Sequence, residues 1–209
     1  GLHIYDVDRA KIEVHDEVTF NNKFPVFTFP DGNTYLTYSP FISEPTLFKY
    51  DRITNQELGS FEIPSTIGSG VVVNGGMYSS PDGERLYMFD RSVDGHIFLE
   101  VNMNDFTITE HPYPGGKVLY GMPSPENQTP DKSKVLFTTW TDSQLTDITA
   151  HYLDTITGQV TAVASEKTPF HATVVNDDYF VISEGTANGD TVADRFVEQC
   201  VFRGFTDGH

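Results

Sequence analysis

The chain has 209 residues, a formal charge of −17 from 13 Lys and Arg against 30 Asp and Glu, and a single cysteine. A field of that sign repels phosphate backbones, which argues against nucleic acid as a partner. One cysteine excludes an internal disulfide framework and a cysteine-based zinc site, and no apolar run approaches the roughly 18 residues of a transmembrane helix, so we expect no membrane span.

The acidity and the single cysteine leave partner and compartment open. An acidic surface keeps a protein in solution, and the same surface attracts cations or basic partners. One cysteine is compatible with the cytoplasm, with a periplasm and with the cell exterior. We favour a periplasmic or secreted protein over a cytoplasmic one. The first residues, Gly1 to Tyr5, lack a basic region followed by an apolar one, so we expect no signal peptide in them.

Short runs of Tyr, Phe, Val, Ile and Thr alternate along the chain with Asp-Gly, Asn-Gly, Gly-Gly and Pro, which is the pattern of strands and turns. A first marker is a strand that ends in an acidic or amide residue. It occurs at Asp6, Asp51, Asn102 and Asp154, with spacings of 45, 51 and 52 residues. Residues 193–203 fit either a short helix or a strand.

A second marker is a turn that precedes a strand. It occurs as Pro30-Asp31-Gly32, Pro81-Asp82-Gly83, Pro130-Asp131-Lys132 and Asn176-Asp177-Asp178, and its first three copies are 51 and 49 residues apart. Pro presets φ, Asp bonds the backbone and Gly accepts a positive φ, so the turn joins two antiparallel strands. Two markers with one period of roughly 50 residues predict four-stranded propeller blades.

The phase of the markers predicts a single propeller domain over 1–209 whose chain starts and stops within a blade. The expected units are a half blade over 1–20, then 21–66, 67–112, 113–165 and 166–209. The N-terminal strands, Leu2–Val7 and Lys11–Phe20, form the outer half of a blade, and the C-terminal strands form an inner half. We expect them to share the last blade and to close a ring of about four or five blades. A segment of a larger propeller, which would self-associate through its open edges, and a two-sheet sandwich are the alternatives.

The last repeat resembles those of YVTN-type propellers. Residues 153–161, LDTITGQVT, are similar to the Asp-x-x-Thr-Gly-x-Val stretch of that family, and Pro169-Phe170-His171 is similar to its Pro-His stretch, with Phe170 as an extra residue. Residues 179–182, YFVI, stand where the family has its Tyr-Val-Thr-Asn strand. The resemblance is good over 148–185, fair over 47–92 and weak elsewhere, and it extends to lactonase-like and surface-layer propellers. It implies a fold; enzymes, electron carriers and binding scaffolds share it.

Propeller ligands are expected near the starts of the inner strands, where this chain has Phe24-Pro25, Asn74-Gly75-Gly76, Tyr120-Gly121 and His171. His171 is the candidate general base or metal ligand, with Asn74 and Tyr120 as helpers, because imidazole titrates near neutral pH. The alternative is a histidine that is hydrogen-bonded in the channel wall. The other histidines at 15, 96, 111 and 151 share no phase and form no recognisable metal set.

A second candidate site is a loop with three oxygen ligands, Asn188, Asp190 and Asp194, which suits Ca²⁺ but also fits a solvated turn. No triad, phosphate loop or metal set stands out elsewhere. The sequence therefore favours a binding or interaction propeller, in which loops at one end of the channel contact a protein or small-molecule ligand. A lactonase-like or lyase-like enzyme with its site at the channel mouth is the alternative.

Overall fold

The computed structural model describes residues 2–6, 10–15, 24–39, 45–64, 76–89, 97–121, 123–141, 147–187 and 195–205. Residues Gly1–Ile63 and Pro64–His209 form two compact units. Over the described ranges the regular structure is β-strand except for two 3₁₀ turns, η1 (Pro114–Gly116) and η2 (Pro125–Asn127), which confirms the predicted all-β class. Neither of these turns is long or apolar enough to cross a membrane.

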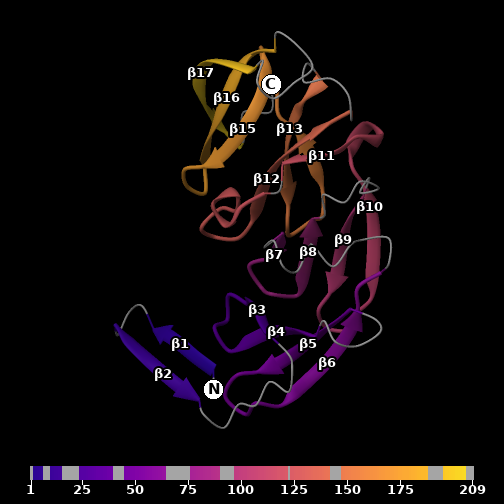
Figure 1. Ribbon diagram of the computed structural model, residues 1–209, viewed down its shortest axis with the longest axis vertical. Coiled ribbons are helices and arrows are strands. Elements are labelled where there is room, and N and C mark those ends of the chain that lie inside the picture. The colour runs from indigo at the N-terminus through magenta and orange to yellow at the C-terminus, as the bar shows by residue number, and fades with distance from the viewer. Residues whose placement is uncertain are drawn as a thin grey trace. The chain divides into compact units, whose positions relative to one another are not determined.

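The N-terminal unit contains a two-stranded sheet and a four-stranded sheet (Figure 1). The first pairs β1 (Leu2–Asp6) with β2 (Lys11–His15). The second, called here the β3 sheet, has the order β3 (Phe24–Thr28), β4 (Thr34–Ser39), β5 (Thr46–Asp51) and β6 (Glu57–Glu62). Its strands are antiparallel and follow one another in chain order, as expected for one propeller blade.

The C-terminal unit contains three antiparallel sheets, each named here by its first strand. The β7 sheet consists of β7 (Met77–Ser79), β8 (Arg85–Phe89), β9 (Ile97–Asn102) and β10 (Ile108–Pro112). The β11 sheet consists of β11 (Val118–Gly121), β12 (Lys134–Trp140), β13 (Thr149–Asp154) and β14 (Val160–Ala162). The β15 sheet has three strands, β15 (Thr168–Val174), β16 (Tyr179–Ala187) and β17 (Arg195–Gly204).

Both sequence markers form the side-chain-bonded turns that their chemistry predicts. Asp31 Oδ1 accepts hydrogen bonds from the backbone N–H groups of Asn33 (2.9 Å) and Thr34 (2.8 Å). Asp82 and Asp131 accept the corresponding bonds in the next two repeats. In the other marker, the side-chain oxygens of Asp51, Asn102 and Asp154 accept bonds from N–H groups two or three residues later. Each of the three four-stranded blades is therefore shaped locally by a turn before its second strand and a turn after its third.

The position that follows Pro-Asp in the second marker takes a positive φ in three repeats. It is Gly32 at 66° and Gly83 at 71°, where the sequence supplies glycine, but Lys132 at 68° in the β11 sheet. A side chain in this region is strained, at about 1–2 kcal/mol. Lys132 therefore adopts a conformation that glycine would adopt more easily.

Both neighbours of the second strand in the last blade come from the C-terminal part of the chain, and β17 takes the place beside β16 that the marker phase gave to Leu2–Val7. Closure of the ring by the N-terminal strands stays a prediction. β16 pairs with β15 on one side and with β17 on the other, from Tyr179↔Gly204 to Ala187↔Arg195. Among the pairings that the structure describes, β1 pairs with β2 alone. Residues 193–203, which fitted a helix or a strand, largely belong to β17. The reason is proximity in sequence, because closing a short connection costs less chain entropy than pairing the two ends of the chain.

Aromatic side chains fill the space between the β7 and β11 sheets. The cluster joins Tyr78, Tyr87, Phe89, Phe98 and Tyr113 of the first region to Leu119, Val135, Phe137 and Leu153 of the second. Phe89 and Phe137 meet across this space with their ring centroids 5.2 Å apart. A second cluster, Leu136, Ala150, Ala172, Phe180, Ile182 and Phe205, joins the β11 and β15 sheets. Each buried aromatic contributes about 1.5–3 kcal/mol, so packing of sheet on sheet holds the three blades together.

A turn from the β11 sheet also docks on the β7 sheet through polar groups. The hydroxyl of Tyr87 donates to the backbone carbonyl of Thr155 at 3.1 Å, in a buried position. Gly158, at φ 76°, lies so close that a Cβ there would be 3.3 Å from Oε2 of Glu100. The glycine of the Thr-Gly motif is therefore favoured by its backbone conformation, and a side chain there would also crowd the carboxylate of Glu100 on the neighbouring blade.

Candidate functional site

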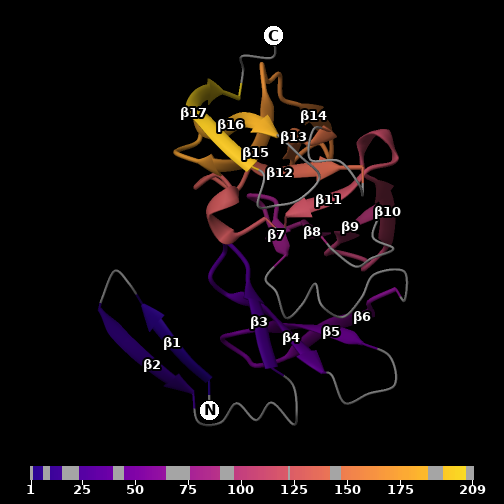
Figure 2. The same cartoon turned by 45° about the horizontal axis from the view of Figure 1, so that its top comes forward.

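A polar cleft lies between the β11 and β15 sheets, whose strands β12 and β15 run side by side (Figure 2). Its volume is about 250 Å³. Ten residues from three segments line it: Pro123, Ser124, Glu126 and Asn127 around η2; Leu136, Phe137 and Thr138 of β12; and His171, Ala172 and Thr173 of β15. The cleft therefore has a mainly polar lining with hydroxyl, amide, carboxylate and imidazole groups.

The wall around η2 is held by its own side chains. Oδ1 of Asn127 accepts a bond from the backbone N–H of Ser124 at 2.8 Å and another from the Ser124 hydroxyl at 2.7 Å. The backbone N–H of Asn127 returns a bond to the carbonyl of Ser124 at 2.8 Å. Pro125 occupies the first position of the turn, where its missing N–H is not needed. The segment is thus a closed turn with a fixed shape.

Three bonds tie this turn to the neighbouring sheets. Nδ2 of Asn127 donates to the carbonyl of Ala172 on β15 at 2.5 Å. On the other side, the Tyr78 hydroxyl donates to the carbonyl of Ser124 at 3.2 Å, and Nε2 of Gln128 donates to the carbonyl of Ser79 at 2.8 Å. We call residues 123–128 the strap, because this segment of the β11 sheet links the β7 sheet to β15. Burial raises the pKa of the Tyr78 phenol, which keeps this donor protonated.

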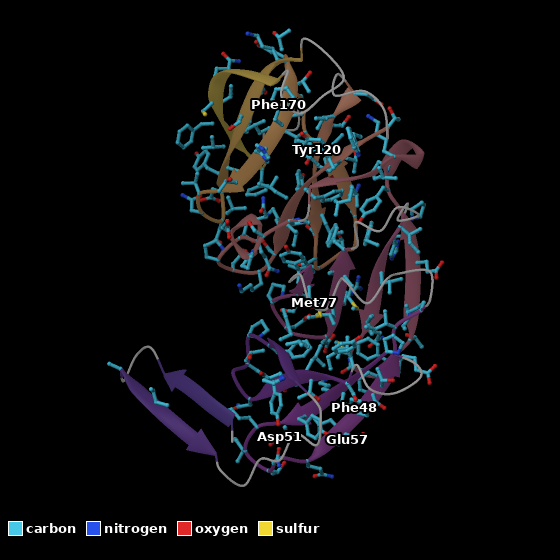
Figure 3. All side chains as sticks on the ribbon, in the orientation of Figure 1. Phe48, Asp51, Glu57, Met77, Tyr120 and Phe170 are labelled. Atoms are coloured by element: carbon cyan, nitrogen blue, oxygen red, sulfur yellow. The ribbon has the colours of Figure 1, made fainter. Side chains whose placement is uncertain are left out.

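A bulge in β15 presents His171 to the cleft. The pairing of β15 with β16 shifts between Pro169 and His171, so Phe170 is the extra residue of the strand. Phe170 is fully buried in a cluster with Tyr120 and Ile148, and Figure 3 labels Phe170 and Tyr120. His171, the next residue, is exposed. Phe170, the extra residue relative to the Pro-His stretch that the sequence resembles, therefore anchors β15 in the interior. The imidazole of His171 lies at the surface.

The structure brings one of the predicted catalytic residues to the cleft. His171 lines it, whereas Tyr120 is buried and packs edge to face on Trp140, with ring centroids 5.1 Å apart. Asn74 lies outside the described residues, and so do the three proposed calcium ligands, Asn188, Asp190 and Asp194. Over the ranges that the structure describes, no three His, Cys, Asp or Glu side chains are grouped so that they could hold a metal ion.

The other described histidines with side-chain contacts belong to the blades. His111 and Glu100 of the β7 sheet form a pair with Nε2 and Oε2 2.9 Å apart, and Arg85 contacts the same carboxylate at 3.1 Å. His151 is buried, lies 2.9 Å from the Thr139 hydroxyl and stacks on Phe137. Burial, and then the charge of Lys117, lowers the pKa of His151 to about 4. This imidazole is therefore neutral at pH 7.

Glu126 gives the cleft a negative charge. Its carboxylate is exposed, and hydrogen bonding to its own backbone N–H lowers its pKa by favouring the charged form. No Lys or Arg occurs among the residues described as lining the cleft. Glu126 is thus ionised at neutral pH and lines the same cleft as Thr173 and the imidazole of His171.

Sequence analysis missed the strap residues, Ser124, Glu126 and Asn127. The available signal was the run Ser-Pro-Glu-Asn, in which Ser and Pro are typical of the start of a helical turn. That signal gives the local conformation but not the bond to Ala172, which lies 45 residues later. A further depression of about 370 Å³ is lined by Ile148, Thr149, Val163 and residues 165–169, and none of the described residues predicted as functional lines it.

No protein-family model and no curated protein sequence matches the chain, but solved structures do. An oligogalacturonate lyase from Vibrio parahaemolyticus is 11% identical with a TM-score of 0.52, over 90% of this chain and 53% of that one. An oligogalacturonate lyase in complex with manganese is 17% identical with a TM-score of 0.50, over 79% and 45%. TolB from Acinetobacter baumannii is 15% identical with a TM-score of 0.48, over 87% and 45%.

These similarities concern the fold, because the identities are low. The chain spans about half the length of the structures that it matches. The matched proteins are propellers, and the sheets described above have the antiparallel chain-order arrangement of propeller blades. The chain therefore has the β-propeller fold.

Proposed function

We propose that this protein is a propeller binding module that takes a small polar ligand in the cleft between the β11 and β15 sheets. The observation that carries the proposal is the 250 Å³ cleft itself, with His171, Glu126 and Thr173 at its surface. Sites for drug-sized ligands occupy roughly 300–1,000 Å³, so this cleft suits a smaller molecule. Protein partners that insert a single polar side chain would use the same groups.

The strap supports a binding role because it fixes one wall before any ligand arrives. Asn127 uses both ends of its amide, toward Ser124 and toward Ala172, and Tyr78 holds the strap from the opposite side. A wall that is already ordered loses little conformational entropy when a ligand binds. The remaining polar groups of the cleft are then presented in a defined arrangement.

A panel of small probes tests the proposal: galactose, galacturonate, galactosamine, phosphorylcholine and glutamine, each titrated by saturation-transfer NMR. Thr173→Trp fills the cleft from an exposed position on β15, and Thr109→Trp places the same side chain at an exposed position on β10. We expect at least one probe to bind the natural protein and the Thr109 variant, and to lose binding in the Thr173 variant. Binding that survives Thr173→Trp, or a panel without any binder, refutes the proposal.

A lyase-like or lactonase-like enzyme is a second candidate, favoured by an exposed imidazole and a carboxylate in one cleft. His171 would act as the general base, and Glu126 replaces the helpers expected from the sequence. In a lyase, the base takes a proton from the carbon next to the sugar carboxyl, a C=C bond forms and the glycosidic C–O bond breaks, and the leaving oxygen departs as a hydroxyl after it takes a proton from water or from the protonated base. Oligogalacturonate as substrate and absorbance of the unsaturated product test this, and His171→Ala must abolish turnover without lowering the melting temperature.

We also propose that the repeats are of the YVTN type. The support is the turn closed by Asp154, the positive φ of Gly158 and the placement of His171 after a bulge at Phe170. These features occupy the positions that the family pattern gives to its Asp, Gly and His. A set of close homologues tests the proposal: Asp154, Gly158 and His171 must then be retained more often than the exposed residues around them.

A further inference from the structure

The chemistry of the cleft points to the charge of its ligand. We propose that it accepts hydroxyl-rich, uncharged molecules of monosaccharide size and discriminates against sugar acids, with Glu126 as the residue that sets this preference. The inference rests on the proposed binding function and adds the class of ligand. Such a preference would distinguish this chain from proteins that bind acidic sugars, even where the fold is similar.

Charge is the first argument. Glu126 is exposed at the cleft, and the described lining residues include no Lys or Arg. Two lysines of the β11 sheet have partners of their own. Lys134 lies 5.2 Å above the ring of Phe205, and Lys117 donates to Asp147 at 2.7 Å. With a formal charge of −17 for the whole chain, a second carboxylate in the cleft would be repelled by Glu126, and the imidazole of His171 is the one basic group among the described lining residues that could offset this.

Hydrogen-bonding capacity is the second argument. Oδ1 of Asn127 accepts from the Ser124 hydroxyl, and one N–H of its Nδ2 donates to the carbonyl of Ala172, so this amide has at most one further N–H to offer a ligand. A ligand therefore meets the Glu126 carboxylate, which can only accept, with the Thr173 hydroxyl and the imidazole of His171 nearby. Sugar hydroxyls both donate and accept, so they suit this set. A ligand carboxylate is acceptor-only and cannot bond to Glu126.

The size of the preference follows from the exposure of Glu126. Because Glu126 is exposed, water weakens its repulsion of a second carboxylate. We therefore expect a modest preference, a difference of about fivefold in dissociation constant. Screening reduces the difference as salt rises toward 1 M, where the Debye length is about 3 Å.

Three probes that differ in the charge of one group test the inference: galactose, galacturonate and the methyl ester of galacturonic acid. Dissociation constants are measured by saturation-transfer NMR at low ionic strength. We expect galactose and the ester to bind within about twofold of each other, and galacturonate to bind at least about fivefold more weakly. Glu126→Gln should bring galacturonate within about twofold of the ester. Glu166→Gln removes the same charge from an exposed residue outside the cleft and should leave the difference unchanged.

The outcomes distinguish this inference from the proposed function. Galacturonate that binds the natural protein as tightly as its ester, or a difference that survives Glu126→Gln, overturns the charge preference while the binding function stands. The same holds if phosphorylcholine or glutamine binds in the cleft and the three sugars do not. Failure of every probe in the panel instead refutes the binding function. Turnover of oligogalacturonate at this cleft would contradict the inference directly.

Discussion

Replacing Asn127 by Asp tests the strap with a change of one functional group. The aspartate keeps two oxygens that can accept from Ser124, but it loses the N–H that donates to the carbonyl of Ala172 at 2.5 Å. A neutral hydrogen bond contributes about 0.5–1.5 kcal/mol, and a buried acceptor left without a donor costs about 1–3 kcal/mol. Because the contact is only partly buried, we expect Asn127→Asp to lower the free energy of unfolding by about 2 kcal/mol.

The assay is urea unfolding, supported by the melting temperature, for which 1 kcal/mol corresponds to roughly 2–4 °C in a protein of this size. Ser124→Ala is the matched comparison, because it removes one hydroxyl bond to Asn127 and leaves the bond between β15 and the strap intact. It should cost about 1 kcal/mol or less. A loss from Ser124→Ala equal to that from Asn127→Asp would refute the role assigned to the Ala172 bond.

Three further substitutions test the turns and the buried histidine. Gly158→Ala should lower the free energy of unfolding by more than Gly116→Ala, since both have positive φ but only Gly158 faces a neighbouring side chain, with Oε2 of Glu100 3.3 Å from the added Cβ; equal losses would argue against the contact. Lys132→Gly should raise the free energy of unfolding by about 1 kcal/mol, because glycine adopts a φ of 68° with less strain than lysine. A lower free energy of unfolding in this variant would contradict the assignment. The pKa of His151 is lowered to about 4 in the folded protein, against about 6.5 in the unfolded chain. As the pH falls from 6.5 to 4, the unfolded chain binds the proton first, so the free energy of unfolding falls by about 1.4 kcal/mol per pH unit. His151→Gln should flatten the pH dependence of urea midpoints there, and an unchanged slope would refute this.

The repeat was predictable because each marker is closed by side chains within three residues of the turn. Asp31 and Asp154 bond to backbone N–H groups two or three positions later, so the local sequence contains both partners. The positions of strands follow from such turns. The third strand of the last blade was not predictable in this way, because residues 193–203 fit either a helix or a strand, and the structure places β17 beside β16.

The candidate site was only partly predictable. His171 follows from its place on an inner strand, and the structure puts it at the cleft. Tyr120 satisfied the same positional rule, but packing with Phe170 and Trp140 placed it in the interior. Aromatic side chains fit either environment, and the strand pattern does not decide between them. Asn127 acts through a backbone carbonyl 45 residues away, which leaves no periodic trace in the sequence.

A crystal structure of the protein soaked with galactose tests the central claim most directly, because it shows both the cleft and its occupant. The account predicts a sugar seated between the strap and β15, with a ring hydroxyl donating to the carboxylate of Glu126 and Asn127 bonded to the carbonyl of Ala172. A strap detached from β15, or galactose bound only at sites away from Glu126 and His171, would contradict it.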